Sequence, residues 1–237
     1  MIEAYIICWN EIDTIQLTID HYKKFCERIT FYDNYSNDGT AELIRLNDCN
    51  IEFFGTKGKL EDREYIKIKN NCWKDSKADW VIVCDCDEII WHKNLKEILS
   101  YEKATVFKTI GFDIFSEEMP KDDFLEIQTG VPSLNYSKIA VFSPTIKSIN
   151  YVYGCHVADP VGGVRFSSER LNLFHYRNIG GLERLKNRHK QYRERLSDHN
   201  KKLGLGIHYL EDDDERQKNW YNSLSKAVHF NTYRNLE

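Results

Sequence analysis

The 237-residue sequence has no long apolar run, no segment of low complexity and no internal repeat. Its first residues, MIEAYIICWNE, combine a short apolar stretch with an acid at Glu3, so we expect neither a signal peptide nor a membrane span there. Positive charge is not in excess, because the formal net charge is −4, and this argues against nucleic acid as a partner. We therefore expect a cytoplasmic globular protein that meets any lipid substrate at a membrane surface.

Paired cysteine motifs are also missing. The seven cysteines are odd in number and scattered, and no CxxC pair indicates a zinc site or a thioredoxin-like redox motif. Reduced thiols in a cytosolic compartment are the simplest interpretation, with disulfides as the alternative. The four prolines all lie between Pro120 and Pro160, so the middle of the chain is expected to be rich in loops.

The composition is that of a globular chain with a sizeable core. Hydrophobic residues make up 41% and charged residues 30% of the sequence. A chain of this length falls within the range of one α/β domain, so we expect a single domain over residues 1–237 with two functional halves. The aromatic share of 13% suits a surface that stacks on flat rings or sugar faces, although most aromatic residues will be core.

Alternating apolar runs and amphipathic stretches predict βα units in the first third of the chain. Strands are expected at 4–8, 29–32, 51–54 and 80–84, because each is a short apolar run. Helices are expected at 13–25, at 40–46 with Thr40 as the cap, and at 61–74. Two further helices are expected from residue 182 onward and over 214–230. The predicted fold is α/β, with a mixed, mostly parallel Rossmann-like sheet flanked by helices and followed by C-terminal helices.

The most informative segment is WVIVCDCDE (80–88), in which an apolar strand runs directly into acidic residues. Side chains at i and i+2 of a strand point to the same side, so Asp85 and Asp87 should converge at the carboxyl end of a central strand, where open α/β sheets bind ligands. Two close carboxylates repel each other unless a cation or proton intervenes, and Mg²⁺ or Mn²⁺ held together with phosphate oxygens would relieve that repulsion. The alternative is that the acids merely end the strand and cap the next helix.

A second polar segment, DNYSNDGT (33–40), follows the second expected strand. Taken alone it is an ordinary turn, because Ser and Asp side chains can hydrogen-bond their own backbone and glycine supplies flexibility. The ends of the first, second and fourth strands should nevertheless line one crevice. Asn10, Glu11 and Asp33 could therefore face the same ligand as Asp85 and Asp87.

These residues resemble the glycosyltransferase GT-A superfamily, in particular its family 2-like and family 92-like members. The opening strand followed by WNE (9–11) looks like their N-terminal nucleotide edge, DNYSNDGT is similar to their acidic segment that ends in Asp-Gly-Thr, and DCD (85–87) matches their DxD metal motif. The resemblance implies a nucleotide-sugar-binding half at 1–91, usually for a UDP-sugar with Mn²⁺ or Mg²⁺, and an acceptor half with C-terminal helices at 92–237. By the same resemblance, Asp33 would hydrogen-bond the base, Asp85 would face the ribose or the metal, and Asp87 would bind the metal directly.

The second half resembles these enzymes less closely. GCH (154–156) and LFHYR (173–177) are similar to segments that follow the DxD strand in the family 92-like enzymes. A late histidine often completes the metal shell of GT-A enzymes, which would make His175, after an apolar run, a ligand at a strand end. His156 is the second candidate, and either histidine could instead be a packing residue.

Other catalytic residues are less well defined by the sequence. Arg63, between the third and fourth strands, could place positive charge near the donor, or it could belong to a solvated helix start. If the reaction inverts the anomeric configuration, as in the family 2 relatives, a carboxylate must take the acceptor proton. Asp159 and Glu118 are the candidates for this base, although each could be a surface acid. A retaining enzyme would not need the base.

A basic amphipathic helix is expected at 184–195, where arginines and lysines flank an apolar stripe. Its basic side has three interpretations: a solvated face, which is the simplest, a contact with an anionic membrane or a lipid-linked acceptor, or a lid over the donor phosphates. The predicted function is transfer of a sugar, of the hexosyltransferase type, from a nucleotide-sugar to a glycan or lipid-linked acceptor.

Two other functions stay open on the sequence alone. A haloacid-dehalogenase-like phosphatase also has a strand that ends in DxD, but it usually places a small residue and then Thr or Val after the second acid, where Glu88 and Ile89 stand here. A catalytically silent module that binds a nucleotide-sugar or carbohydrate would fit the aromatic content, but it would not require both acids.

Overall fold

The computed structural model describes residues 1–101 and 103–230. The strands are β1 (Ile2–Cys8), β2 (Arg28–Asp33), β3 (Asn50–Phe53), β4 (Trp80–Asp85), β5 (Glu88–Trp91), β6 (Val106–Phe115), β7 (Thr129–Pro132), β8 (Val141–Phe142), β9 (Phe166–Asn178) and β10 (Val228–His229). The helices are α1 (Ile15–Lys23), α2 (Thr40–Leu46), α3 (Asp62–Asn71), α4 (Leu95–Tyr101), α5 (Gly181–Arg195), α6 (Asp198–Lys202) and α7 (Asp213–Lys226), with short 3₁₀ turns η1 (Phe124–Glu126) and η2 (Ile207–Leu210).

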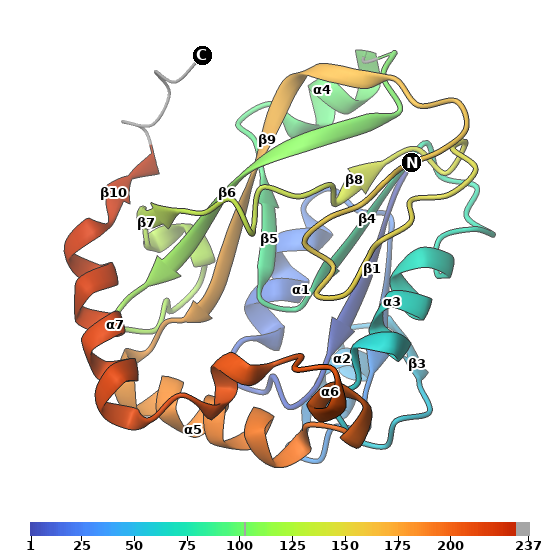
Figure 1. Ribbon diagram of the computed structural model, residues 1–237. Coiled ribbons are helices and arrows are strands. Elements are labelled where there is room, and N and C mark those ends of the chain that lie inside the picture. Colours follow the sequence, from blue (N-terminus) through green and yellow to red (C-terminus); the bar gives the residue numbers. More distant parts are fainter. Residues whose placement is uncertain (102, 231–237) are drawn as a thin grey trace.

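These strands form one mixed sheet with helices on both faces (Figure 1). Within the described residues, the strand order is β10-β7-β6-β8-β4-β1-β2-β3, and β9 pairs with both β5 and β6. The long pairings, β1 with β2, β1 with β4 and β6 with β9, are parallel, whereas the antiparallel pairings are short. The structure thus confirms the expected α/β class with a mixed, mostly parallel sheet.

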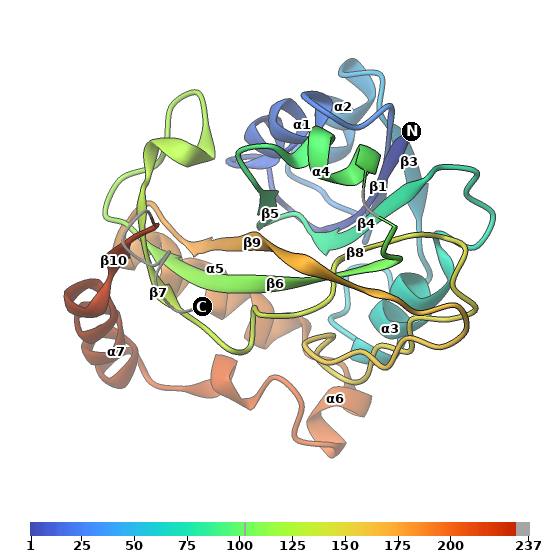
Figure 2. The same ribbon diagram turned by 90° about the horizontal axis from the view of Figure 1, so that it is seen from above.

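The alternation of side chains along β1 explains how the parallel half is covered on both faces. Ala4 and Ile6 pack in the same buried cluster as Ile19 of α1, whereas Tyr5 packs in a second cluster with Trp73, just after α3. A strand that is buried on both faces needs apolar side chains at odd and even positions alike, which is why nearly all residues of β1 are apolar. Figure 2 shows α1 and α2 on one side of these strands and α3 on the other.

The second half brings distant segments together through its two longest strands. β5 runs antiparallel to β9, which places His175 opposite Glu88, and β6 runs parallel to β9, which places Asp113 beside His175. After β9 the chain turns into α5, which lies across the end of the sheet where the β1 arrow finishes (Figure 1). The sheet and α5 together therefore surround the carboxyl ends of the central strands.

Most of the expected elements are confirmed to within a few residues, and the differences are informative. β4 ends at Asp85, and Cys86 and Asp87 form a turn into β5, so the two acids do not share one continuous strand, as the i and i+2 argument assumed. A strand follows this turn, so helix capping does not explain the acids. The start of α2 is stabilised by Asp38, whose Oδ1 accepts the backbone N–H of Thr40 (3.0 Å). The expected cap, Thr40, does not have that role. The last expected helix ends earlier, at Lys226.

None of the helices in the described part of the chain combines the length and apolarity that a bilayer crossing requires. All seven cysteines are free, and four of them, Cys8, Cys84, Cys86 and Cys155, are buried. Cys86 packs in the main core cluster between the two acids of the 85–88 turn. It is a packing residue of that turn.

Candidate active site

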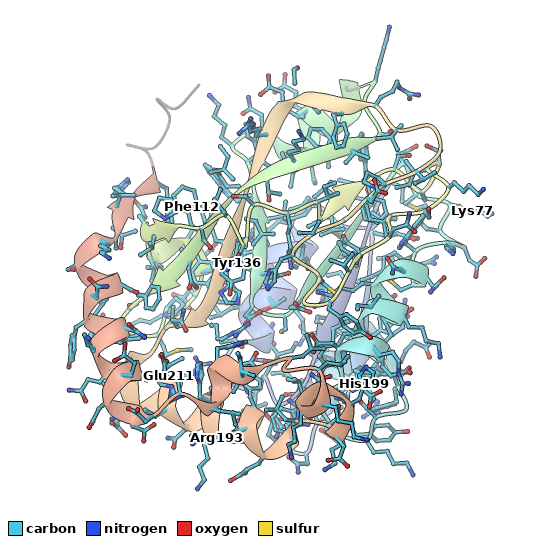
Figure 3. The ribbon with its side chains drawn as sticks, viewed as in Figure 1. Lys77, Phe112, Tyr136, Arg193, His199 and Glu211 are labelled. Carbon is cyan, nitrogen blue, oxygen red and sulfur yellow. The ribbon has the colours of Figure 1, made fainter. Side chains whose placement is uncertain are left out.

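A cavity of about 550 Å³ lies at the carboxyl ends of β1 and β4. Both halves of the chain contribute to its wall: residues that follow β1 and β4, one face of α3, the end of β9, and side chains of α5. Figure 3 shows Tyr136, one of the wall residues, near the centre of the view, with Arg193 of α5 below it. Open α/β sheets bind their ligands at this edge, so the cavity is the candidate active site.

The turn of residues 85–88, here called the DxD turn, is fixed by hydrogen bonds to its own backbone. The N–H of Asp85 donates to Oε2 of Glu88 (3.0 Å), and the N–H of Tyr176 on β9 donates to the carbonyl oxygen of Asp87 (2.7 Å). Glu88 is buried, and its other carboxylate oxygen is paired with the Nζ of the equally buried Lys138 (2.5 Å). The turn therefore holds the side chains of Asp85 and Asp87 at the cavity wall, where both are found.

Asp85 faces a buried lysine. The Nζ of Lys69, on α3, lies 2.8 Å from Oδ1 of Asp85, and the lysine side chain is 2% exposed while that of Asp85 is 39% exposed. Burial alone would lower the pKa of Lys69, but the negative charge of Asp85 raises it well above its usual value. Lys69 is therefore a fixed positive charge in the cavity wall.

Asp87 has two cationic neighbours from β9. Its Oδ2 lies 3.4 Å from Nε2 of His175 and 3.6 Å from Nε of Arg177. Burial alone would raise the pKa of Asp87, but His175 and Arg177 hold it well below its usual range, so Asp87 is ionised. Burial alone would lower the pKa of His175, but the negative charge of Asp87 raises it to about 9.

The imidazole of His175 is held on its other side as well. Its Nδ1 lies 2.8 Å from Oδ1 of Asp113, which also accepts from Nδ2 of Asn178 (2.9 Å). The ring of Tyr136 stacks on the imidazole, with 3.9 Å between ring centroids and 17° between planes. His175 is 1% exposed in its side chain, so this ring is enclosed everywhere except toward Asp87 and the cavity.

Part of the basic side of α5 faces the cavity or packs against its wall. Arg188 is buried, forms an ion pair with Glu11 and donates to the hydroxyl of Tyr192 (2.9 Å). The guanidinium of the buried Arg195 lies over the ring of Trp9, with its Cζ 3.3 Å from the ring centroid. The interpretation of this basic side as a solvated face is therefore wrong for Arg188 and Arg195, which the rest of the fold encloses.

Two of the residues predicted to bind the nucleotide, Glu11 and Asp85, line the cavity. Asn10 instead hydrogen-bonds across to the side chain of residue 37 (2.9 Å). Asp33 is fully buried, and its Oδ1 accepts the backbone N–H of Ser36 (2.7 Å), so it closes its own turn. That is the simpler of the two interpretations of the 33–40 segment, and it leaves Asn10 and Asp33 outside the cavity wall.

Arg63, Glu118 and Asp159 also lie outside the cavity wall. Arg63 is exposed at the start of α3 and is paired with Glu61 (2.6 Å). Glu118 and Asp159 are exposed on loops. The structure thus brings neither candidate base to the acids of the DxD turn, because each is part of a surface connection. His156 does line the cavity, with its Nδ1 2.9 Å from the carbonyl oxygen of Asn135.

Sequence reasoning missed several residues of the wall, among them Lys69, Asp113, Tyr136 and Arg177. Lys69 lies on a charged helix, where one lysine among many gives no signal of its own. Asp113 is the single acid in VFKTIGFDIF (106–115), and an isolated acid in a mostly buried strand is the one signal that could have identified a member of the site.

The acids and the histidine have the chemistry of a divalent-cation site, but they do not close one by themselves. Within residues 1–101 and 103–230, no three His, Cys, Asp or Glu side chains gather closely enough to hold a metal ion. The ion pairs engage Oδ1 of Asp85 and Oδ2 of Asp87. Magnesium-type sites commonly combine one or two carboxylates with substrate phosphate oxygens, so this donor set fits a cation that arrives with a diphosphate.

The known proteins that match this chain are all solved structures. No protein-family model matches the sequence, and no curated protein sequence does so either. Among solved structures, glucosyl-3-phosphoglycerate synthase from Mycobacterium tuberculosis, in complex with Mn²⁺, UDP and glucosyl-3-phosphoglycerate, has a TM-score of 0.35 at 16% identity, over 47% of this chain and 44% of that one. Mannosyl-3-phosphoglycerate synthase from Rubrobacter xylanophilus has a TM-score of 0.35 at 16% identity, over 47% and 40%.

The S. aureus TarS 1–349 structure aligns over more of the chain, with a TM-score of 0.47 at 10% identity, over 99% of this chain and 73% of that one. The alignments to the two synthases span less than half of either chain. Similarities of this size do not assign an activity. The function proposed below therefore rests on the site itself and on the sequence motifs.

Proposed function

We propose that this chain is a metal-dependent glycosyltransferase that moves a sugar, of the hexosyl type, from a nucleotide-sugar to an acceptor hydroxyl. A UDP-sugar is the donor that the resemblance to GT-A enzymes favours, and a glycan or glycolipid is the proposed acceptor. The observation that carries the proposal is the DxD turn: Asp85 and Asp87 line one cavity, at the carboxyl end of the parallel strands, together with His175 and buried basic side chains.

The charges of the cavity suit a diphosphate. Lys69, Arg177 and Arg195 line its wall, Arg188 is paired with Glu11 of that wall, and the side chains of all four are mostly buried. Arginine and lysine side chains held in a low-dielectric wall stabilise phosphate charge more strongly than the same groups in water. These residues would therefore bind the donor and stabilise the negative charge that grows on the leaving nucleoside diphosphate.

A divalent cation, Mn²⁺ or Mg²⁺, would be held by Asp87 and Asp85 with His175, and it would add Lewis-acid stabilisation of the leaving diphosphate. Asp87 is already ionised next to His175 and Arg177, so no proton has to leave this carboxylate for it to act as a ligand.

The proposed nucleotide half is residues 1–91, where Trp9 and Tyr65 present aromatic rings to the cavity. The acceptor half is residues 92–237.

An inverting reaction would need a carboxylate at the cavity wall to take the acceptor proton. Glu118 and Asp159 are exposed on loops away from that wall. Asp62 and Asp113 lie on it, and neither has a lysine or arginine as ion-pair partner among the described residues. Asp62 is engaged with Asn200, and Asp113 with His175, so a base role for either would compete with an existing hydrogen bond.

The proposal is tested by measuring thermal stabilisation and slow donor hydrolysis with UDP-, GDP- and dTDP-sugars, in Mn²⁺, Mg²⁺ or a chelator. A metal-dependent increase in the melting temperature, with sugar release from one donor, is the expected result and would name that donor. Binding without turnover across a broad acceptor panel would favour a silent binding module. Phosphate release from simple phosphate esters, without a response to any nucleotide-sugar, would favour a phosphatase.

A further inference from the structure

Asp113 is the single acid of β6, a strand whose residues are mostly buried. Its neighbours on β6, Phe112 and Ile114, are buried, whereas the side chain of Asp113 is 23% exposed and reaches the cavity. The parallel register of β6 and β9 sets Asp113 beside His175. A carboxylate in this position is costly unless it has a partner, so its partner indicates what it does.

The partner of Asp113 is the far side of the proposed metal-binding histidine. Oδ1 of Asp113 lies 2.8 Å from Nδ1 of His175. The carboxylate oxygen accepts a hydrogen bond from Nδ1–H, and Nε2 is the nitrogen that faces Asp87, at 3.4 Å from its Oδ2. The hydrogen bond thus decides which nitrogen of His175 meets the cavity.

Two further contacts fix this arrangement. Asn178 Nδ2 donates to the same Oδ1 of Asp113 (2.9 Å), which keeps the carboxylate from turning away. Tyr136 stacks flat on the imidazole, so the plane of the ring is set as well as its edge. The imidazole is therefore held in one plane and one orientation by residues that do not themselves face Asp87.

We propose that Asp113 is a positioning residue that orients His175 for the cation bound with the donor diphosphate, and this proposal rests on the function proposed above. Asp113 acts through His175 and does not bind the cation. Carboxylates that accept from the second nitrogen of a metal-binding histidine fix its orientation and raise its basicity, and their loss weakens metal binding by about 10–100-fold.

The test compares Mn²⁺ binding to the purified protein in the presence of UDP, followed by the electron paramagnetic resonance signal of free Mn²⁺. Asp113→Ala is expected to weaken Mn²⁺ binding by about tenfold or more. Asp113→Asn keeps an oxygen that accepts from Nδ1–H, so its Mn²⁺ affinity is expected to stay within about threefold of wild type. Asp159→Ala removes the same charge from an exposed loop and is the matched control, with no expected change.

Asp113→Ser, whose hydroxyl is too short to replace the carboxylate, serves in place of the alanine variant if that variant does not fold. Wild-type Mn²⁺ affinity in a folded Asp113→Ala or Asp113→Ser protein would overturn the positioning role. Asparagine as damaging to Mn²⁺ affinity as alanine would also overturn it, because charge and not orientation would then matter. Wild-type protein that binds no Mn²⁺ with UDP would instead overturn the proposed function on which this inference rests.

Discussion

The ammonium group of Lys69 lies 2.8 Å from Oδ1 of Asp85, although the lysine side chain is 2% exposed. This contact joins α3 to the carboxyl end of β4, so a buried positive charge balances the first acid of the DxD turn before any ligand is bound. Asp87, the second acid, is balanced from β9 by His175 and Arg177. Each carboxylate of the DxD turn therefore has a cationic partner of its own in the cavity wall.

Replacing Lys69 with methionine is expected to lower both stability and donor affinity. The variant keeps the length of the side chain but leaves Asp85 without its partner. Because Asp85 is 39% exposed, the loss in the free energy of unfolding should be about 1–3 kcal/mol, below that of a fully buried pair. UDP should bind about tenfold more weakly, which corresponds to about 1.4 kcal/mol, since one fixed positive charge is lost. Urea unfolding and calorimetric titration measure the two effects.

Lys67→Met is the matched control, because Lys67 is on the same helix and its side chain is 72% exposed. It should change stability by no more than about 0.5 kcal/mol. The double variant Lys69→Met with Asp85→Asn should regain part of the lost stability. A Lys69→Met protein that is as stable as wild type would show that the Lys69–Asp85 contact does not stabilise the fold.

Gly111→Ala is expected to disturb the loop that carries Tyr136. A Cβ at residue 111 would lie 2.2 Å from the carbonyl carbon of Tyr136, so the backbone of that loop would have to move. Overpacking of this kind costs about 1–3 kcal/mol, and the shift would separate Tyr136 from the ring of His175. Gly55→Ala, where a Cβ meets nothing within 4 Å, is the control. Equal urea midpoints for the two variants would contradict this account of the loop.

The stability of the protein should fall in mild acid because of His21. This residue of α1 is 4% exposed, its Nε2 lies 2.9 Å from the carbonyl oxygen of Ile90, and burial lowers its pKa from 6.5 to about 4. Between those pH values the unfolded chain takes up a proton that the folded chain does not. The free energy of unfolding therefore falls as the pH drops through this window, by about 2 kcal/mol at pH 5 from this group alone.

The variant His21→Gln keeps an amide that can donate to Ile90 and does not titrate in this range. Its free energy of unfolding, measured in urea at pH 7 and pH 5, should fall by about 2 kcal/mol less than that of wild type. The other histidines are common to both proteins and cancel in the comparison. The same fall in both proteins would rule out His21 as the source.

The local part of the fold could be predicted from the sequence because its signals are short-range. The apolar run 80–84 and the helix 40–46 are fixed by residues close together in the chain, and both are confirmed by β4 and α2. The DxD turn was located for the same reason. The expected continuous strand through Asp87 was wrong, but both acids nevertheless lie on the same cavity wall.

The rest of the site depends on contacts between distant segments, which periodicity does not encode. Helical spacing in 184–195 showed which residues share a face, but not that Arg188 would meet Glu11, 177 positions earlier in the chain. The pairing of Asp113 with His175 likewise depends on the register of β6 against β9. Asp33 was assigned to the ligand by resemblance, and the contact that the structure gives it is with the Ser36 N–H of its own turn, a short-range bond that the resemblance did not indicate.

The most direct test of the proposed function is the affinity of UDP for wild type and Asp87→Ala, measured by calorimetric titration in Mn²⁺ and again in a chelator. Wild type is expected to bind UDP at least about tenfold more tightly with Mn²⁺, a difference of about 1.4 kcal/mol. The folded Asp87→Ala protein is expected to bind UDP equally with and without the metal. A folded Asp87→Ala protein that keeps the metal-dependent affinity of wild type would contradict the assignment of the DxD turn as the metal site of a glycosyltransferase.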